Sequence, residues 1–294
     1  MRIVSLLPAA TEMVCALGLE SWLVGRSHEC DFPASVEALP VCSSASFPDG
    51  SSSAIDREVK ERVRSGLSLY QVDFEKLRQL QPDLLLTQDQ CEVCAVTLGQ
   101  VEEGLRAQCG LQAEVFSMHP RRLEDVWSEF LSLATRLGQA PRGHQLLEDW
   151  RARLLACNGR SGQRVVALEW LDPLMGCGGW TPELIAMAGA VEVLGQAGQH
   201  ARWTSLEELA CLDPDVFLLI PCGFSLQRAL QEIEELGLVR KLAKPCIAWD
   251  GNALFNRSGP RLVDSAEWLA RALAGESGPH WEFLSLRKGY EASL

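Results

Sequence analysis

Short apolar runs alternate with stretches in which apolar residues recur at helical spacing, along most of the 294 residues. The short runs predict buried strands, and the period of about 3.6 residues predicts amphipathic helices. Thr11 is expected to cap the first helix and Gly18 to close it. Residues 275–294 have weak periodicity and are expected to fray. Strands are predicted at 2–7, 22–25, 114–117, 164–169, 216–220 and 246–249, and a further helix and strand, the latter ending at Leu86, follow residue 72. The other helices are predicted at 11–18, 54–65, 123–137, 141–158, 205–212 and 262–273.

One predicted helix, 141–158, stands between two halves of the chain that resemble each other. Pro141 suits the first turn of a helix, where a backbone N–H is not needed. Leu147, Trp150 and Leu154 recur at helical spacing on one face. A helix of about 17 residues is about 25 Å long, since each residue adds about 1.5 Å. This helix is therefore long enough to connect two domains.

The two halves repeat the same sequence pattern. The segment DFEKLRQLQPDLLL, which starts at Asp73, matches the segment SLEELACLDPDVFL, which starts at Ser205. Such an internal duplication predicts an α/β fold of two similar Rossmann-like lobes, joined by the single long helix and with a ligand cleft between them. The predicted domains are an N-terminal lobe at 1–120, a helical linker at 121–163, a C-terminal lobe at 164–275 and a tail at 276–294.

Composition and charge narrow the classes of partner. With 47% hydrophobic and 22% charged residues, the chain has the composition of a soluble globular protein. The net charge of -12 argues against nucleic acid or an anionic membrane as the main partner, because phosphate binding needs a surplus of Lys and Arg. No segment approaches the ~20 apolar residues of a membrane span, so membrane insertion is not expected. We expect a monomer that binds a small molecule.

The cysteines and the first residues bear on the compartment. The 11 cysteines are scattered rather than spaced as a disulfide framework, which is typical of a reducing compartment. Residues 3–10 are apolar, but Pro8 interrupts them and Thr11 follows, which is too short a core for a secretory signal. We therefore expect a cytoplasmic protein. The alternative is a periplasmic or extracellular protein from which a signal peptide was removed.

Polar and aromatic motifs follow several predicted strands and make the sequence recognisable. The chain opens with RIVSLLPAATE at 2–12, continues with LVGR at 23–26, and has a Pro-Asp pair before a strand in each half. Together with the linking helix, these features resemble the class III periplasmic binding proteins over residues 1–273. The resemblance is nearest to the members for vitamin B12 and more distant to those for iron-siderophores and haem. Within that superfamily the chain is similar to a subgroup labelled cobalamin-binding. The motifs of the subgroup are SHECD at 27–31, QDQCEVC at 88–94, LEWLDP at 168–173, CGF at 222–224 and DGN at 250–252.

The resemblance implies binding of a small ligand. Members of the superfamily pass their ligand to an ABC permease, on which they dock through one glutamate of each lobe. By position these glutamates map to Glu75 and Glu207, whose other role is favourable charge in the first turn of a helix. The resemblance implies cobalamin or another metal chelate as the ligand, and no cofactor is otherwise predicted.

The candidate ligand-binding residues follow strand ends in both lobes, where doubly wound folds place their ligands. The first lobe offers polar or soft donors. The second lobe combines hydrogen-bonding groups and carboxylates with aromatic rings that suit a large conjugated ligand, although any one ring taken alone fits the core better. The candidates are His28, Glu29, Cys30, Gln88, Asp89 and Cys91 in the first lobe, and Glu169, Trp170, Asp172, Trp180, Phe224, Asp250, Asn252, Asn256 and Arg257 in the second.

Cys91 and Cys94 have the CxxC spacing of a zinc half-site or a redox pair. No second CxxC completes a structural zinc site, so His28 and Cys30 are the candidates for further metal ligands. The alternative is that the two cysteines pack as small apolar groups near a helix start. The sequence alone leaves both interpretations open.

A second function hypothesis is a cytosolic enzyme built on the same scaffold. It would use Glu169, Asp172 and the Cys91/Cys94 pair, since carboxylates at strand ends suit acid-base chemistry. Carboxylates also cap the turns that follow strands, and Asp172 precedes a proline in such a turn. The sequence has no GxGxxG, Walker loop, HExxH or nucleophile elbow, which weakens the nucleotide-binding and ordinary hydrolase interpretations.

Overall fold

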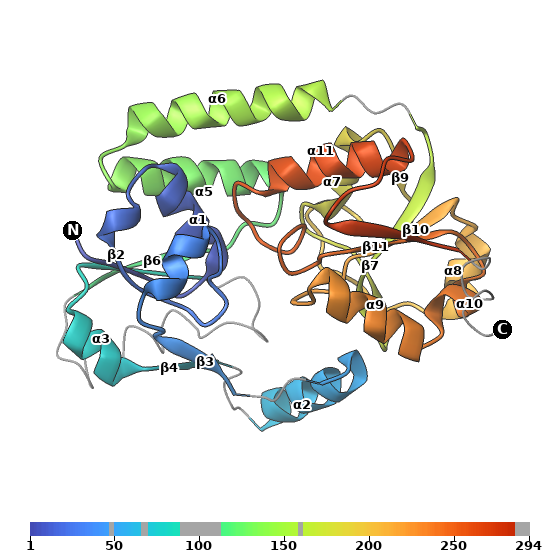
Figure 1. The fold of residues 1–294 in the computed structure, drawn as a ribbon, viewed down its shortest axis with the longest axis horizontal. Coiled ribbons are helices and arrows are strands. Elements are labelled where there is room, and N and C mark those ends of the chain that lie inside the picture. The colour runs from blue at the N-terminus through green and yellow to red at the C-terminus, as the bar shows by residue number, and fades with distance from the viewer. Residues whose placement is uncertain (47–49, 66–69, 89–112, 158–160, 286–294) are drawn as a thin grey trace. The chain divides into compact units, whose positions relative to one another are not determined.

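The chain forms two compact units in the computed structural model (Figure 1). The structure describes residues 1–46, 50–65, 70–88, 113–157 and 161–285. The first unit comprises Met1–Gly50, Ala54–Pro120 and Glu124–Leu146, and the second comprises Ser51–Ser53, Arg121–Leu123 and Leu147–Leu294. Helix α6, Ala140–Ala156, carries the chain from the first unit to the second. The finer predicted division, with a separate linker and tail, stays a prediction.

The first unit is built on a parallel sheet with helical connections. Its strands are β1 (Ile3–Ser5), β2 (Leu23–Arg26), β3 (Ser43–Ala45), β4 (Tyr70–Val72), β5 (Leu84–Gln88) and β6 (Glu114–Met118), and its helices are α1 (Pro8–Ala16), α2 (Ser52–Arg64), α3 (Phe74–Leu80) and α5 (Leu123–Arg136). Helix α2 begins with residues that belong to the second unit. The sheet has the order β2-β1-β5-β6, and all its pairings are parallel. β3 and β4 form a separate antiparallel pair.

The second unit contains a mixed sheet. Its strands are β7 (Arg164–Leu171), β8 (Leu174–Gly176), β9 (Val191–Glu192), β10 (Val216–Leu219), β11 (Cys246–Trp249) and β12 (Trp281–Leu284), and its helices are α7 (Thr181–Met187), α8 (Leu206–Leu212), α9 (Leu226–Glu235), α10 (Leu238–Leu242) and α11 (Leu262–Leu273). The order is β12-β11-β10-β7-β8, with β9 paired to β7. β7, β10 and β11 run parallel, as doubly wound folds require. The predicted α/β fold is therefore confirmed.

The central strands of both units have continuous apolar, buried segments. Leu84, Leu85 and Leu86 in β5 have no exposed surface, and neither have Val165 and Val166 in β7. Parallel strands covered on both faces read as continuous apolar runs rather than as alternating patterns. For this reason the hydrophobic pattern located these strands from the sequence. None of the described helices is both long enough and apolar enough to cross a membrane.

The duplicated segments fold in the same way in the two units. The side chain of Asp73 caps α3 by accepting a hydrogen bond of 2.8 Å from a backbone N–H, and Ser205 caps α8 with a bond of 3.3 Å. Both helices end in a left-handed residue, Gln81 with φ 47° and Asp213 with φ 45°. Each then leads into a central strand, β5 or β10. This shared local structure supports the internal duplication.

Two expectations from the sequence pattern are wrong. Thr11 does not cap the first helix, which begins at Pro8; it is buried inside the helix, where its Oγ1 donates to the carbonyl of Leu7 at 3.3 Å. Proline at the start of α1 accounts for the earlier beginning. The chain after residue 275 does not simply fray, because Trp281–Leu284 adds an antiparallel edge strand to β11. The buried ring of Trp281 stacks on Trp249 at 5.1 Å and so holds this strand in place.

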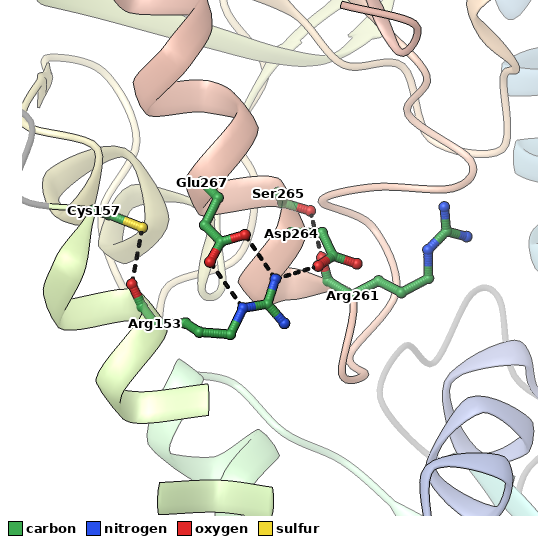
Figure 2. Close-up of polar contacts among 6 residues, drawn as sticks. All are labelled: Arg153, Cys157, Arg261, Asp264, Ser265 and Glu267. Atoms are coloured by element: carbon green, nitrogen blue, oxygen red, sulfur yellow. Dashed lines mark hydrogen bonds and ion pairs between the residues drawn. The ribbon is translucent and has the colours of Figure 1, made fainter. Parts of the chain in front are cut away.

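Within the second unit, a forked ion pair joins α6 to α11 (Figure 2). Nε and Nη2 of Arg153 donate to the carboxylate of Glu267 at 2.8 and 2.7 Å. Nη2 also donates to Asp264 at 2.7 Å. The guanidinium lies between the two carboxylates, as Figure 2 shows. The second half of α6 is thus held to α11 by the planar geometry that arginine offers to carboxylates.

Candidate ligand-binding site

The loop after β2 is held in shape by the side chain of Arg26. Nη1 donates to the carbonyls of Ser27 and Cys30, both at 3.0 Å, and Nη2 donates to the carbonyl of Glu37 at 3.1 Å. A guanidinium can hold several carbonyl groups at once because its donors point in fixed directions. The loop that Arg26 organises carries the predicted first-lobe residues His28 and Glu29.

His28 and its neighbours form a partly exposed polar and aromatic group in the first unit. Nδ1 of His28 lies 3.0 Å from Oγ of Ser43, and the backbone N–H of His28 donates to the same oxygen at 3.3 Å. The ring of Tyr70 lies 5.5 Å from the imidazole, and its hydroxyl donates to Glu29 at 3.4 Å. This arrangement fixes the imidazole by one nitrogen. Tyr70 is one of only two tyrosines and was not among the residues predicted for the site.

The other first-lobe candidates are placed differently. Cys30 is buried, and its sulfur lies 3.1 Å from the hydroxyl of Thr11 and 3.2 Å from that of Ser27, so this thiol does not face solvent. Gln88 is half-buried at the end of β5. Asp89, Cys91 and Cys94 lie outside the described residues. Among the residues that are described, no group of three or more His, Cys, Asp and Glu side chains is arranged to hold a metal ion.

In the second unit, Glu169 lies near the end of β7 and accepts two hydrogen bonds at one carboxylate oxygen. The donors are the N–H of Gly178 at 3.4 Å and the hydroxyl of Thr181 at 3.1 Å. Part of the residue is exposed, but protein atoms surround its carboxyl group. Burial raises the pKa of Glu169 to about 7, although the two hydrogen bonds act to lower it. Thr181 was not among the residues predicted for the site.

A second buried carboxylate, Glu192, has a structural role beside Glu169. It accepts backbone hydrogen bonds from Ala167 at 3.0 Å, from Leu194 at 2.8 Å and from Gly195 at 2.9 Å. These bonds connect β7 to the chain after β9. Burial and the two nearby carboxylates raise the pKa of the Cys177 thiol well above its usual range. This cysteine is therefore protonated and unreactive at neutral pH.

Five aromatic residues of the second unit lie in or after strand ends, and four of them belong to the core. The five are Trp170, Trp180, Phe224, Trp249 and Phe255. Trp180, Phe224, Trp249 and Phe255 are all less than a tenth exposed. The indole N–H of Trp180 donates to the carbonyl of Phe255 at 2.5 Å, which explains how this tryptophan is buried. Trp170 alone of the five is partly exposed. It is the ring of this set that can contact a ligand.

The loop after β11 is organised by its own polar side chains. Oδ1 of Asp250 accepts from a backbone N–H three residues on at 2.8 Å. Nδ2 of Asn256 donates to the carbonyls of Ile220 and Gly251, at 3.0 and 2.7 Å. A side chain at Gly251 would collide with the backbone, since its Cβ would lie 2.1 Å from a carbonyl oxygen. These contacts hold the ends of β10 and β11 together.

The remaining second-lobe candidates differ in how far their side chains are exposed to solvent. Arg257 is buried, whereas Asn252 and Asp172 are partly exposed. The backbone N–H of Asn252 donates to the carbonyl of Phe224 at 2.9 Å, which brings the loop after β11 against the loop after β10. The structure thus brings Trp170, Phe224 and the 250–257 loop together at the strand ends of the second unit. The predicted ligand contacts of these residues stay a prediction.

Glu75 and Glu207 are both exposed in the first turn of a short helix. Glu75 accepts from Arg78 at 2.6 and 2.9 Å and from Gln79 at 3.1 Å, which lowers its pKa. A hydrogen bond with Ser205 lowers the pKa of Glu207. Both glutamates are therefore charged and accessible at neutral pH, and their docking role stays a prediction.

Comparison with known proteins gives relatives over nearly the whole chain. A vitamin B12-binding protein of Yersinia pestis (strain Pestoides F) is 23% identical over 284 residues, which cover 95% of this chain and 88% of the relative. The fold is similar to that of a periplasmic heme-binding protein from Pseudomonas aeruginosa, with a TM-score of 0.71, 21% identity and coverage of 97% and 98% of the two chains. It is also similar to the periplasmic vitamin B12-binding protein BtuF of Vibrio cholerae, with a TM-score of 0.58, 19% identity and coverage of 93% and 96%.

The predicted cytoplasmic location is contradicted by the comparisons, because the family model that matches residues 3–242 is that of the periplasmic binding proteins. The inference of a reducing compartment from the number of cysteines was wrong. Partial burial raises the pKa of Cys15 to about 12, and burial raises that of Cys42 to about 11; a protonated thiol is slow to oxidise. A count of cysteines therefore does not identify the compartment.

The comparisons also decide the family. The predicted resemblance rested on the opening motif, the repeated Pro-Asp strands and the linking helix, and the structure contains the α/β architecture that this resemblance implies. A model of the periplasmic binding protein family matches residues 3–242, which is well over half of the sequence. The chain belongs to the periplasmic binding protein family.

Proposed function

We propose that this chain is a solute-binding protein for a flat, metal-bearing macrocycle, a corrinoid or a tetrapyrrole such as haem. The observation that carries the proposal is the similarity, over 95% of the chain, to a protein named as vitamin B12-binding. The fold neighbours that are named as heme-binding support the same ligand class, because corrins and porphyrins share a large conjugated or partly conjugated ring. The exact ligand stays open between the two.

The chemistry of the partly exposed residues supports this ligand class. The indole of Trp170 offers a flat apolar surface, which is what a macrocycle face needs. The partly exposed side chain of Asn252, in the loop beside Phe224, can pair with the amide or carboxyl groups at a macrocycle's edge. In the first unit the imidazole of His28 is fixed by Ser43 and offers a further polar contact.

Two finer predictions remain part of the proposal. The first is that the ligand lies in the cleft between the lobes. The second is that an ABC permease receives the ligand after docking at Glu75 and Glu207. None of the names of the three reported relatives supports the alternative of an enzyme that uses Glu169, Asp172 and the Cys91/Cys94 pair.

The proposal is tested by titrating the purified protein with cyanocobalamin, with hemin and with a ferric siderophore, and by following their absorbance. We expect one of the first two probes to bind with a dissociation constant of about 1 μM or lower, which corresponds to about −8 kcal/mol. The absence of any spectral or thermal response to cyanocobalamin and hemin up to about 100 μM would overturn the proposal.

Point variants make the same titration specific to the site. Trp170→Ala and His28→Ala should each weaken binding by at least about tenfold, or about 1.4 kcal/mol. Trp203→Ala is the matched control, because Trp203 is half exposed and lies outside the predicted site. Equal affinities of all three variants and the unmodified protein would mean that the ligand binds elsewhere.

A further inference from the structure

Three residues of the N-terminal half, Ser51–Ser53, belong to the second unit, whereas the chain on both sides of them belongs to the first. The central residue, Ser52, has no exposed surface. A serine at the start of a helix can be exposed, because water can then satisfy its polar groups. The burial of Ser52 therefore requires protein partners for these groups. Its partners therefore identify what this segment does.

Ser52 is bound by a buried carboxylate of α9. Its backbone N–H donates to Oε1 of Glu232 at 2.7 Å, and its hydroxyl donates to the same oxygen at 2.5 Å. Glu232 is only 6% exposed. A buried carboxylate is costly unless hydrogen-bond donors meet it, so these two bonds determine where Ser52 sits.

The carbonyl of Ser52 makes the third contact. It accepts a hydrogen bond of 3.2 Å from the indole Nε1 of Trp170, which stands near the end of β7. Since the N–H and hydroxyl of Ser52 are both held by Glu232, its carbonyl has little freedom to turn away from Trp170. The indole is therefore tied at its nitrogen to a group that α9 holds in place.

The indole of Trp170 also has a ring contact in this region. Trp170 packs edge-on against Phe224, with 5.7 Å between the ring centroids. Phe224 is buried, and the guanidinium carbon of Arg228 lies 3.7 Å from the centre of its ring. Arg228 and Glu232 are one turn apart on α9. One helix thus supports Trp170 through Phe224 and through Ser52.

We propose that Glu232 is a positioning residue that, through Ser52, fixes the indole of Trp170 as one wall of the ligand site. The inference rests on the proposed function, because it gives Trp170 a ligand to contact. Glu232 itself does not touch the ligand. A fixed indole binds a flat ligand more tightly than a mobile one, since its rotational freedom is already lost before binding.

The first test needs no ligand. Acrylamide quenching of tryptophan fluorescence is measured for each variant and for the same variant carrying Trp170→Phe, and the difference isolates Trp170 among the nine tryptophans. Glu232→Ala should raise the quenching of Trp170 at least about twofold. Glu232→Gln keeps an acceptor oxygen for Ser52 and should restore the original value. Glu234→Gln, an exposed change on the same helix, is the matched control.

The second test measures coupling through affinity for cyanocobalamin and hemin. Glu232→Ala should weaken binding about tenfold in the unmodified protein and should have no further effect in the Trp170→Phe background, because that background already lacks the N–H donor. Ser52→Ala, which keeps the backbone contacts, should show the same dependence with a smaller loss. If Glu232→Ala does not fold, Ser52→Ala takes its place in both tests.

The outcomes separate the two proposals. If neither probe binds the unmodified protein, the proposed function fails, and the quenching result still decides whether Glu232 positions Trp170. If a probe binds but Glu232→Ala and Trp170→Phe weaken it independently, the positioning role is refuted. Quenching of Trp170 that is equal in Glu232→Ala and Glu234→Gln would refute it as well.

Discussion

The backbone N–H of Arg164 donates to the carboxylate of Asp215 at 2.7 Å, and the N–H of Asp215 donates back to the carbonyl of Arg164 at 2.7 Å. Arg2 and Asp83 form the same pair of bonds in the first unit, at 2.7 and 2.8 Å. In both units the arginine side chain also donates to the carbonyl of the last residue of the duplicated helix, which is Leu80 in α3 and Leu212 in α8. In each unit, the same set of arginine–aspartate hydrogen bonds therefore holds the start of the first strand in place. We call this set the clasp.

Removing the aspartate carboxylate, which is the hydrogen-bond acceptor of the clasp, should destabilise the unit that contains it. We expect Asp215→Ala and Asp83→Ala each to lower the free energy of unfolding by about 1 kcal/mol, because each leaves a strand-initiating N–H without its partner. The measurement is urea denaturation of each variant. Asp215→Asn keeps an acceptor oxygen and should retain most of the stability. Equal losses in the Ala and Asn variants would show that the charge, and not the hydrogen bond, stabilises the clasp.

The elements that the sequence located correctly are those whose signal is local. The strand Cys246–Trp249 and the helix Leu262–Leu273 have the predicted bounds, because a buried apolar run and a helical period are visible within a few residues. The helix caps Asp73 and Ser205 can be inferred from the sequence for the same reason, since each lies directly before its helix. Local signals of this kind account for most of the fold.

The candidate site depends on contacts between distant parts of the chain, which a single sequence does not reveal. Ser52 and Glu232 are 180 residues apart, and neither is unusual in its local pattern. Trp180 and Phe224 were placed in the site because they follow strands, but ring packing and a hydrogen bond to Phe255 put them in the core. Whether an aromatic residue faces ligand or core depends on tertiary packing, which periodicity does not encode.

The stability of the protein should fall as pH rises through the range in which Glu169 loses its proton. Burial raises the pKa of Glu169 from 4.5 to about 7, so the folded state binds more protons than the unfolded state between these values. The free energy of unfolding therefore decreases with rising pH across this window. Glu169→Gln should remove this decrease and raise stability at pH 8 by up to about 3 kcal/mol.

Thermal unfolding of the unmodified protein and of Glu169→Gln, from pH 5 to pH 8, measures this dependence of stability on pH. The gain from Glu169→Gln should shrink as the pH falls toward 4.5, the ordinary pKa of a glutamate. Glu148→Gln is the control, since Glu148 is exposed on α6. A gain at pH 8 that persists unchanged at pH 5 would show that removing the carboxylate acts on packing and not through its titration.

The ion pair between α6 and α11 should contribute modestly and in a pH-dependent way. Arg153→Ala should lower the free energy of unfolding by about 1 kcal/mol, since its partners Glu267 and Asp264 are partly exposed. Arg153 lowers the pKa of Glu267, so this contribution is present above the ordinary pKa of 4.5 and is lost as pH falls through the lowered value. Arg142→Ala, an exposed change on the same helix, is the control. A loss that is the same with and without 1 M salt would contradict an electrostatic role.

Arg26→Lys should loosen the loop that carries His28 without altering a residue that contacts the ligand. Arg26 holds three backbone carbonyls, at 3.0, 3.0 and 3.1 Å, and a lysine ammonium has neither the reach nor the planar donor geometry to hold all three. We expect amide hydrogen exchange in residues 27–37 to accelerate about tenfold, because opening of this loop then breaks fewer bonds.

Ligand affinity provides the second measurement for Arg26→Lys. If the loop forms part of the ligand site, binding of cyanocobalamin or hemin should weaken by about tenfold, since the ligand then has to order a mobile segment. Arg57→Lys is the matched control, because Arg57 is exposed on α2. Faster exchange at unchanged affinity would remove the His28 loop from the site, whereas unchanged exchange would show that the three carbonyl contacts do not hold the loop.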